Sequence, residues 1–340
     1  MLAALSLATA RPASALTINP VYDSSITGLS SASQVEAAFN AVAHDYASSF
    51  ANNNATINVG VSWGSVAGST LPSNAVGESS SSLYGYFSYS QIRSLLTSAA
   101  NSSPADTALA TAIKVLPGAA PSGVSQYVIP SSEAKVLGII SGTSPSLDGS
   151  IGFAGSTSGY TFNPSAGVAP GTFDFEAVAA HELDEVLGRI SGLASTSPTY
   201  RTVYDLFRYS APSVLDLGYN DATYFSIDGG KTNLGTFNGS SSGGDRSDWQ
   251  TTSTSTDIQD AFIQPGRSLN LTAADLTGLD VLGYGGSNLG DTSASSPGTT
   301  AFSLIDETPV PEPGSLALLA SALSLAAFRS QRVCRREWQD

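Results

Sequence analysis

The sequence of 340 residues is short of charge, sulfur and histidine. Charged residues make up 12% of the chain, and there are two histidines, one methionine and one cysteine. Because the single cysteine, Cys334, lies in the extreme C-terminal tail, no intramolecular disulfide can form and no cysteine nucleophile serves the body of the chain. The apolar share of 41% is ordinary, which argues against disorder over most of the length.

Positive charge is scarce as well. Lys and Arg together number 14 against 28 Asp and Glu, which gives a formal net charge of −14. A body this acidic is repelled by phosphate backbones, so we expect no nucleic-acid partner. The same acidity suits divalent cations.

Both ends of the chain are predicted to be targeting segments. Residues 1–15 are apolar and small and end in Ala13-Ser14-Ala15, the A-x-A pattern of a secretory signal peptide. At the other end, Pro311-Glu312-Pro313 precedes an apolar run over 316–328, which is marginally long enough to span a membrane. Four arginines follow this run, and by the positive-inside rule they would stay in the cytoplasm.

The Pro-Glu-Pro motif, short apolar helix and basic tail over residues 310–340 resemble the PEP-CTERM sorting signal of Gram-negative bacteria. This resemblance implies export to the cell envelope or extracellular matrix. It also implies transient anchoring in the inner membrane by a transmembrane helix, and processing by an exosortase-type enzyme. Residues 285–309 are rich in Ser, Gly and Thr and are predicted to be a flexible linker, which leaves 16–284 as the folded domain.

The periodicity of apolar residues predicts an α+β domain. Helical spacing predicts helices over 33–50, 89–99, 105–113, 173–187 and 273–282. Alternation and β-branched content predict strands over 57–63, 126–129, 135–140 and 150–153, and mixed loops and strands that include 222–228 and 233–238.

The helix over 173–187 carries the candidate chemistry. Its apolar residues share one arc that should face the core, while His181 and Glu185 stand on the opposite side. These two residues are one turn apart and roughly 40° from each other around the helix axis. Glu182 projects between the two stripes, and Gly188 suits a left-handed C-cap that ends the helix.

An imidazole and a carboxylate at i and i+4 can bind one metal ion, and the glutamate that follows the histidine can activate a metal-bound water. Zincins place these groups in an HExxH motif, whereas this chain has HExxE, with Glu185 in the place of the second histidine. The extra negative charge makes the metal a weaker Lewis acid. We therefore expect Zn²⁺, with Mn²⁺ or Ca²⁺ as harder alternatives.

The run from His181 to Arg189 resembles a group of bacterial metalloprotease-like proteins that carry HExxE followed by Gly-Arg, often with PEP-CTERM tails. The resemblance covers about residues 35–285 and implies a zincin-like catalytic domain over 16–284 that acts on a polypeptide substrate. Such a domain has a mixed sheet, a central active-site helix and an irregular C-terminal subdomain. Further motifs follow in order at Asp205–Ser210, Tyr224–Gly230, Gly244–Trp249 and Leu279–Tyr284.

The wider resemblance is to metzincins, and here the sequence departs from the pattern. Ser191 stands where the third metzincin ligand would fall, and no methionine follows Met1, so a literal Met-turn is absent. A catalytic site needs a third protein ligand. The candidate is Asp205, because aspartate-ligated zincins use a downstream aspartate; a turn or cap role is the alternative. Tyr209 in the same segment is the candidate for stabilising an oxyanion.

Other polar residues have simpler interpretations. Asp228, Asp245 and Asp248 lie among glycines, where oxygen ligands for Ca²⁺ and solvated turn aspartates are the two alternatives. His44 lies off the apolar stripe of its helix and is predicted to be solvated.

Two functions stay open. The first is an exported metal-dependent endopeptidase, in which Glu182 takes a proton from the metal-bound water and the strand over 57–63 pairs with the substrate. The second is a surface or matrix-binding protein that keeps a zincin fold with a degraded site. A glycosidase pair of Glu182 and Glu185 is disfavoured, because one helix turn holds them too close to straddle a sugar ring.

Overall fold

The computed structural model describes residues 15–50, 53–103, 106–193, 200–219, 221–239, 243–285 and 332–336. Over these residues the chain is a mixed α+β protein with several small sheets and seven α-helices, which confirms the predicted class. The predicted signal peptide up to Ser14, the linker beyond Gly285 and the apolar run over 316–328 lie outside the described residues. Within the described part, none of the helices combines the length and apolarity that a membrane crossing requires.

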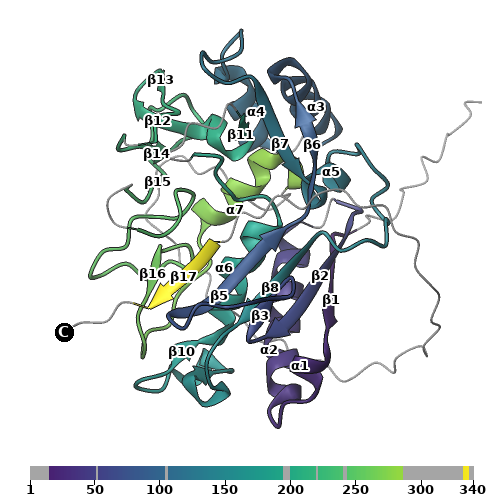
Figure 1. Ribbon diagram of the computed structural model, residues 1–340. Helices are drawn as coiled ribbons and strands as arrows, with labels where there is room; N and C mark the ends of the chain where they lie inside the picture. The colour runs from purple at the N-terminus through teal and green to yellow at the C-terminus, as the bar shows by residue number, and fades with distance from the viewer. Residues whose placement is uncertain are drawn as a thin grey trace, which may run out of the picture.

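A six-stranded mixed sheet is the largest sheet of the molecule (Figure 1). Strands β1, β2 and β8 run parallel, β5 is antiparallel to β8 and to β17, and β16 is parallel to β17. In spatial order the strands are β1 (Thr17–Tyr22), β2 (Thr56–Trp63), β8 (Gly149–Phe153), β5 (Ala75–Ser81), β17 (Arg332–Arg336) and β16 (Phe262–Ile263).

The strand predicted over 57–63 is confirmed as β2, but its expected pairing with a substrate is wrong. Both edges of β2 are already paired, one with β1 and the other with β8. A strand whose two edges are occupied has no backbone groups left for a third chain. The helix carrying His181 lies against two other strands of this sheet, mainly β5 and also β8.

The remaining strands form four smaller sheets. They are β11 (Tyr200–Thr202), β7 (Gln126–Pro130) and β6 (Leu83–Phe87); β13 (Val214–Leu215), β12 (Arg208–Ala211), β14 (Tyr224–Phe225) and β15 (Gly235–Thr236); β9 (Tyr160–Thr161) with β10 (Phe173–Asp174); and β3 (Ser65–Val66) with β4 (Ser69–Thr70). The strands predicted over 222–228 and 233–238 therefore exist only as the two-residue β14 and β15, inside a region held mainly by loops.

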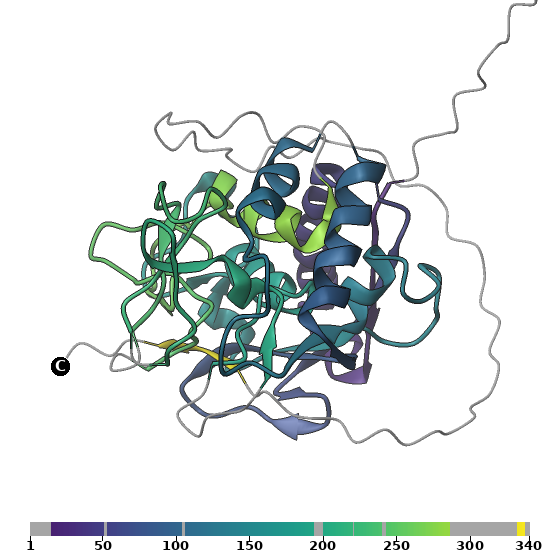
Figure 2. The same ribbon diagram turned by 90° about the horizontal axis from the view of Figure 1, so that it is seen from above.

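Most of the helical ribbon lies on one side of the six-stranded sheet (Figure 2). The α-helices are α1 (Ser24–Thr27), α2 (Ala32–Ser49), α3 (Tyr89–Ser102), α4 (Thr107–Val115), α5 (Ser131–Val136), α6 (Phe175–Val186) and α7 (Ala273–Leu279). All five predicted helices are present. The strand predicted over 135–140 is wrong: Lys135 lies in α5, where its buried ammonium group pairs with Asp148 at 2.6 Å.

The core joins α2 and α6 to the sheet. The rings of Phe153 on β8 and Phe175 on α6 lie 4.5 Å apart between centroids, and Phe39 on α2 contacts Phe153 edge-on. Burial of such aromatic side chains is the main favourable term in folding. The helix α6 is thereby held between the sheet and α2, in the middle of the molecule.

Candidate metal centre

The ends of α6 are set by local interactions. The carboxylate of Asp174 caps the N-terminus by accepting a hydrogen bond from the amide of Ala177 at 3.1 Å. Gly188 follows the last turn with φ +116°, a conformation that side chains disfavour, so the predicted glycine stop is confirmed. A Cβ at Gly188 would also lie 3.3 Å from Leu282, against the turn η4 (Asp280–Tyr284).

Every residue of α6 is buried, which differs from the amphipathic helix that the sequence predicts. The apolar stripe faces the core as expected. The opposite side, which carries His181 and Glu185, is covered by β5 and by the segment over 245–260. Two tyrosine hydroxyls also donate hydrogen bonds to helix carbonyls, from Tyr46 to Ala180 and from Tyr284 to Leu187.

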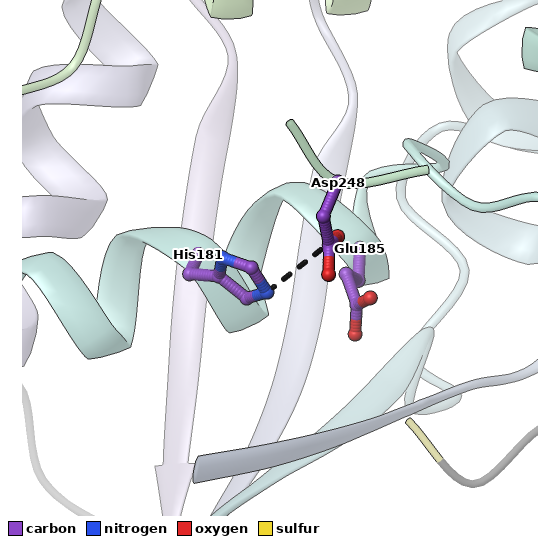
Figure 3. A group of neighbouring side chains, drawn as sticks. All are labelled: His181, Glu185 and Asp248. Carbon is purple, nitrogen blue, oxygen red and sulfur yellow. Dashed lines mark ion pairs between the residues drawn. The ribbon is translucent and has the colours of Figure 1, made fainter. Parts of the chain in front are cut away.

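Three side chains converge on the buried polar side of α6 (Figure 3). One ligand atom each from His181, Glu185 and Asp248 lies within 4.8 Å of the others, a grouping that can hold a metal ion. The imidazole Nε2 of His181 lies 3.8 Å from Asp248 Oδ1. Tetrahedral Zn²⁺ with bonds of about 2.0–2.2 Å separates its ligand atoms by roughly 3.4 Å, so a shift of a few tenths of an ångström would bring this pair to coordination distance.

A backbone carbonyl orients the imidazole of His181. Its Nδ1 lies 2.8 Å from the carbonyl oxygen of Ile258, which can only accept a hydrogen bond. The hydrogen is therefore assigned to Nδ1, and the Nε2 lone pair points to Asp248. Metal-binding histidines are typically held in this way, because the outer hydrogen bond selects the tautomer and the ring orientation.

Strand β5 orients Glu185. The hydroxyl of Ser79 donates a 2.6 Å hydrogen bond to Glu185 Oε2, and the hydroxyl of Ser81 donates to the main-chain carbonyl of Glu185 at 2.9 Å. Alternate residues of one strand thus reach the side chain and the backbone of the same glutamate. The carboxylate faces the other two donors because Ser79 anchors one of its oxygens.

Glu182 lies beside this group on the β5 side. It is fully buried, and among the described residues neither of its carboxylate oxygens accepts a hydrogen bond. Burial raises its pKa well above the ordinary value, and the negative charges of Glu185 and Asp248 add to the shift. A divalent cation held by these neighbours would oppose the shift, since an opposite charge favours the ionised carboxylate.

The space for Glu182 is left by a glycine. A Cβ built on Gly77 of β5 would lie 2.6 Å from Glu182 Oε1 and 2.7 Å from Val178 Cγ1. Both distances are well below normal contact, so only glycine allows the backbone of β5 to approach α6 this closely. No local pattern marks Gly77 in the sequence, because its role depends on the helix that packs against its strand.

Polar contacts hold the segment that carries Asp248 against the C-terminal end of α6. Gln259 donates to Asp184 Oδ2 at 2.8 Å and accepts a hydrogen bond from the guanidinium of Arg189. The same guanidinium stacks over the ring of Trp249 at 4.3 Å from its centroid. No sequence pattern assigns a role to Asp184, although the Gly-Arg pair after α6 and the motif over Gly244–Trp249 lie on the two sides of this contact.

The structure does not bring Asp205 to the metal centre. Its carboxylate accepts hydrogen bonds from the hydroxyl of Ser191 at 2.6 Å and from the amides of Gly192 and Thr202 at 2.8 and 3.0 Å. Asp205 therefore organises the loop after α6, which is the turn role that the sequence left as its alternative. The third position beside His181 is taken by Asp248.

The remaining candidates lie elsewhere. Tyr209 sits on β12, where it pairs with β13 and β14, and burial raises the pKa of its phenol to about 12. The carboxylate of Asp228 accepts hydrogen bonds from the amides of Lys231 and Thr232, as a turn aspartate does. His44 is exposed, as predicted.

Comparison with known protein families, with curated proteins and with solved structures found no match for this chain.

Proposed function

We propose that the protein is a metal-dependent endopeptidase with a zincin-like centre. Its metal would be held by His181, Glu185 and Asp248, and Glu182 would be the general base. The single observation that carries the proposal is the convergence of three donor side chains, each buried to 3% exposure or less, next to a buried glutamate. Three protein ligands leave a fourth tetrahedral position for water or substrate, as in catalytic zinc sites.

The chemistry follows from the positions of these groups. A bound divalent cation supplies a Lewis acid, which lowers the pKa of water and polarises a peptide carbonyl. Glu182 accepts the proton of the attacking water and passes it to the departing amine, so the peptide bond is cleaved with no net change in the protein. Burial favours this transfer, because a dry site strengthens electrostatic interactions.

The donor set indicates a negatively charged centre. Two carboxylates and one neutral imidazole bind the cation, and Glu78 and Asp245 add negative charge near Glu182. We therefore expect Zn²⁺ with a weaker Lewis acidity than in a three-histidine site, and competition from Mn²⁺. Ca²⁺ prefers six to eight oxygen ligands, so the nitrogen ligand of His181 disfavours Ca²⁺ at this site.

The location proposed for this activity is outside the cytoplasm. The terminal segments favour export, a temporary anchor in the inner membrane of a Gram-negative bacterium, and release to the envelope or extracellular matrix by an exosortase-type enzyme. Its substrate would be a polypeptide met in that compartment.

Elemental analysis and caseinolysis test the proposal together. We expect one tightly bound transition-metal ion in the purified wild type, and loss of that ion in His181→Ala and Asp248→Ala. Casein should be cleaved by the wild type, and cleavage should stop with a chelator or in Glu182→Ala, which keeps the metal.

A metal-bound wild type that cleaves no casein would favour the second candidate, a zincin-fold surface or matrix-binding protein with a degraded site. The replacement of the second motif histidine by Glu185 is the observation behind that alternative. Wild type without stoichiometric metal would contradict both.

A further inference from the structure

The strand that pairs with β5 on its side away from β8 comes from the far end of the chain. β17 pairs antiparallel with β5, with Val333 opposite Glu78 and Cys334 opposite Gly77. Its other edge pairs in parallel with β16. Figure 1 shows β17 in yellow between these two strands. The C-terminal segment is therefore held through its backbone on both sides.

Both neighbours of β17 are connected to the metal centre. β5 carries Ser79, which binds Glu185, and Gly77, which lies against Glu182. β16 directly follows the segment that positions Asp248, and the amide of Ala261 next to it donates to the carbonyl of Trp249. An extended chain between β5 and β16 thus pairs with the strand that lies against the proposed general base.

The space between β5 and β16 has the width of one strand. Neighbouring strands lie about 4.8 Å apart, so two strands with one between them are separated by roughly 10 Å. Without an occupant, the facing edges of β5 and β16 would expose unpaired amides and carbonyls, which readily pair with an extended polypeptide. We name this space, bounded by Ala75–Ser81 and Phe262–Ile263, the strand site.

Charge favours a basic occupant. Glu78, Glu182, Glu185 and Asp248 lie on or beside the strand site, and all four are buried. The segment in the site reads Arg-Val-Cys-Arg-Arg, so three of its five residues are arginine. Acidic side chains around a poorly solvated site favour a basic segment over an acidic one.

We propose that the strand site is the polypeptide-binding site of the centre, that it prefers extended arginine-rich segments, and that residues 332–336 occupy it as an intramolecular inhibitor of the full-length chain. Removal of the C-terminal tail, or its withdrawal into a membrane, opens the site. The sorting step would then also be the activation step. This inference rests on the proposed function, because occupation of the site inhibits only if the centre is catalytic.

The first test measures amide hydrogen exchange of β5 in the full-length protein with a chelator present. The variant Val333→Pro/Cys334→Pro is compared with Val333→Ala/Cys334→Ala, which makes the same side-chain positions small but keeps both amides. Successive amides of a strand point to opposite edges, so the two prolines remove one hydrogen bond toward β5 whichever residue donates it.

The β5 amides that face β17 should exchange about tenfold faster in the proline variant than in the alanine variant. Those that face β8 should stay protected in both, which serves as the internal control. Equal exchange in the two variants would overturn the proposal.

A peptide added to the proline variant tests the preference for charge. The peptide Arg-Val-Ser-Arg-Arg should restore protection of β5, and more salt should weaken this effect. The peptide Glu-Val-Ser-Glu-Glu should not restore it. Equal restoration by both peptides would contradict the preference for arginine-rich segments.

Caseinolysis with added Zn²⁺ separates this inference from the proposed function. The proline variant should cleave casein faster than the alanine variant and the wild type. The ratio of cleavage rates should be close to the ratio of the amide exchange rates of β5. Cleavage at equal rates in all three would refute inhibition by the tail and leave the peptidase proposal intact. Protection of β5 by the tail, with no cleavage by any variant, would count against the peptidase proposal alone.

Discussion

The imidazole Nδ1 of His181 lies 2.8 Å from the carbonyl oxygen of Ile258, which is 77 positions further along the chain. This contact selects the tautomer whose Nε2 faces Asp248 Oδ1. The segment that supplies Ile258 also supplies Asp248. Docking of this segment onto α6 therefore places the third donor and orients the first in one step, so the centre is assembled by tertiary packing rather than by the helix alone.

Ser79→Ala should weaken metal binding about 10-fold to 100-fold, because it removes the hydroxyl that holds Glu185 Oε2. Ser81→Ala is the matched control, since Ser81 on the same strand donates to the backbone carbonyl of Glu185 instead. Metal affinity measured by competition with a chromophoric chelator distinguishes the two. Similar losses in both variants would show that the carboxylate orientation is not what Ser79 provides.

Asp248→Asn and Asp205→Asn should act in opposite ways. Asp248→Asn should abolish metal binding and leave the metal-free protein as stable or more stable, since it removes a buried negative charge near Glu182 and Glu185. Asp205→Asn should keep the metal site but lower the free energy of unfolding by about 2–4 kcal/mol, because the single oxygen of an amide cannot accept the three hydrogen bonds that the two carboxylate oxygens share. Denaturant unfolding and elemental analysis of both variants check this, and metal loss in folded Asp205→Asn would contradict the ligand assignment.

Gly77→Ala should impair hydrolysis and also weaken metal binding, because its methyl group would press on Glu182 and Val178 and displace β5, which carries Ser79. The new methyl group would meet Glu182 Oε1 at 2.6 Å and push the general base from its place, which should lower kcat by roughly 100-fold. Gly85→Ala on β6 is the control, because its methyl group would meet only Phe87, at 3.7 Å. Caseinolysis and metal content are measured on both, and wild-type activity in Gly77→Ala would remove Glu182 from the reaction.

Glu176 in the first turn of α6 should make the fold less stable as the pH rises. Burial, with the charges of Asp174 and Asp45, raises its pKa from 4.5 to about 7. Between these values the unfolded chain has released the proton that the folded protein keeps, so the free energy of unfolding falls with pH. Glu176→Gln should remove on the order of 1–2 kcal/mol of this loss.

Unfolding by urea at pH 4.5 and pH 7.5 measures this effect. The free energy of unfolding of Glu176→Gln, relative to that of the wild type, should be higher at pH 7.5 than at pH 4.5. Parallel stabilities of the two proteins across this range would contradict the assignment.

Local pattern was sufficient for the longer helices but not for most of the strands, and it missed β5, the strand beside His181 and Glu185. The spacing of apolar residues predicted α2, α3, α4, α6 and α7, and alternation predicted β2. It failed over 135–140, where the apolar run around Ile140 suggested a strand, whereas the chain continues from α5 into a turn. There the buried pair of Lys135 with Asp148 holds the segment, and a contact between residues so far apart leaves no local periodicity.

The sequence by itself determined that His181 and Glu185 share one side of a helix with Glu182 at its edge, because helix geometry is local and repeats every 3.6 residues. Only the tertiary structure decided the third donor, because Asp205 and Asp248 are both downstream aspartates and spacing does not distinguish them. Their surroundings do: one carboxylate is saturated by the hydrogen bonds of its own loop, and the other is turned toward the imidazole. The neighbours of β5 were likewise decided by sheet pairing, which joins segments with no relation in sequence.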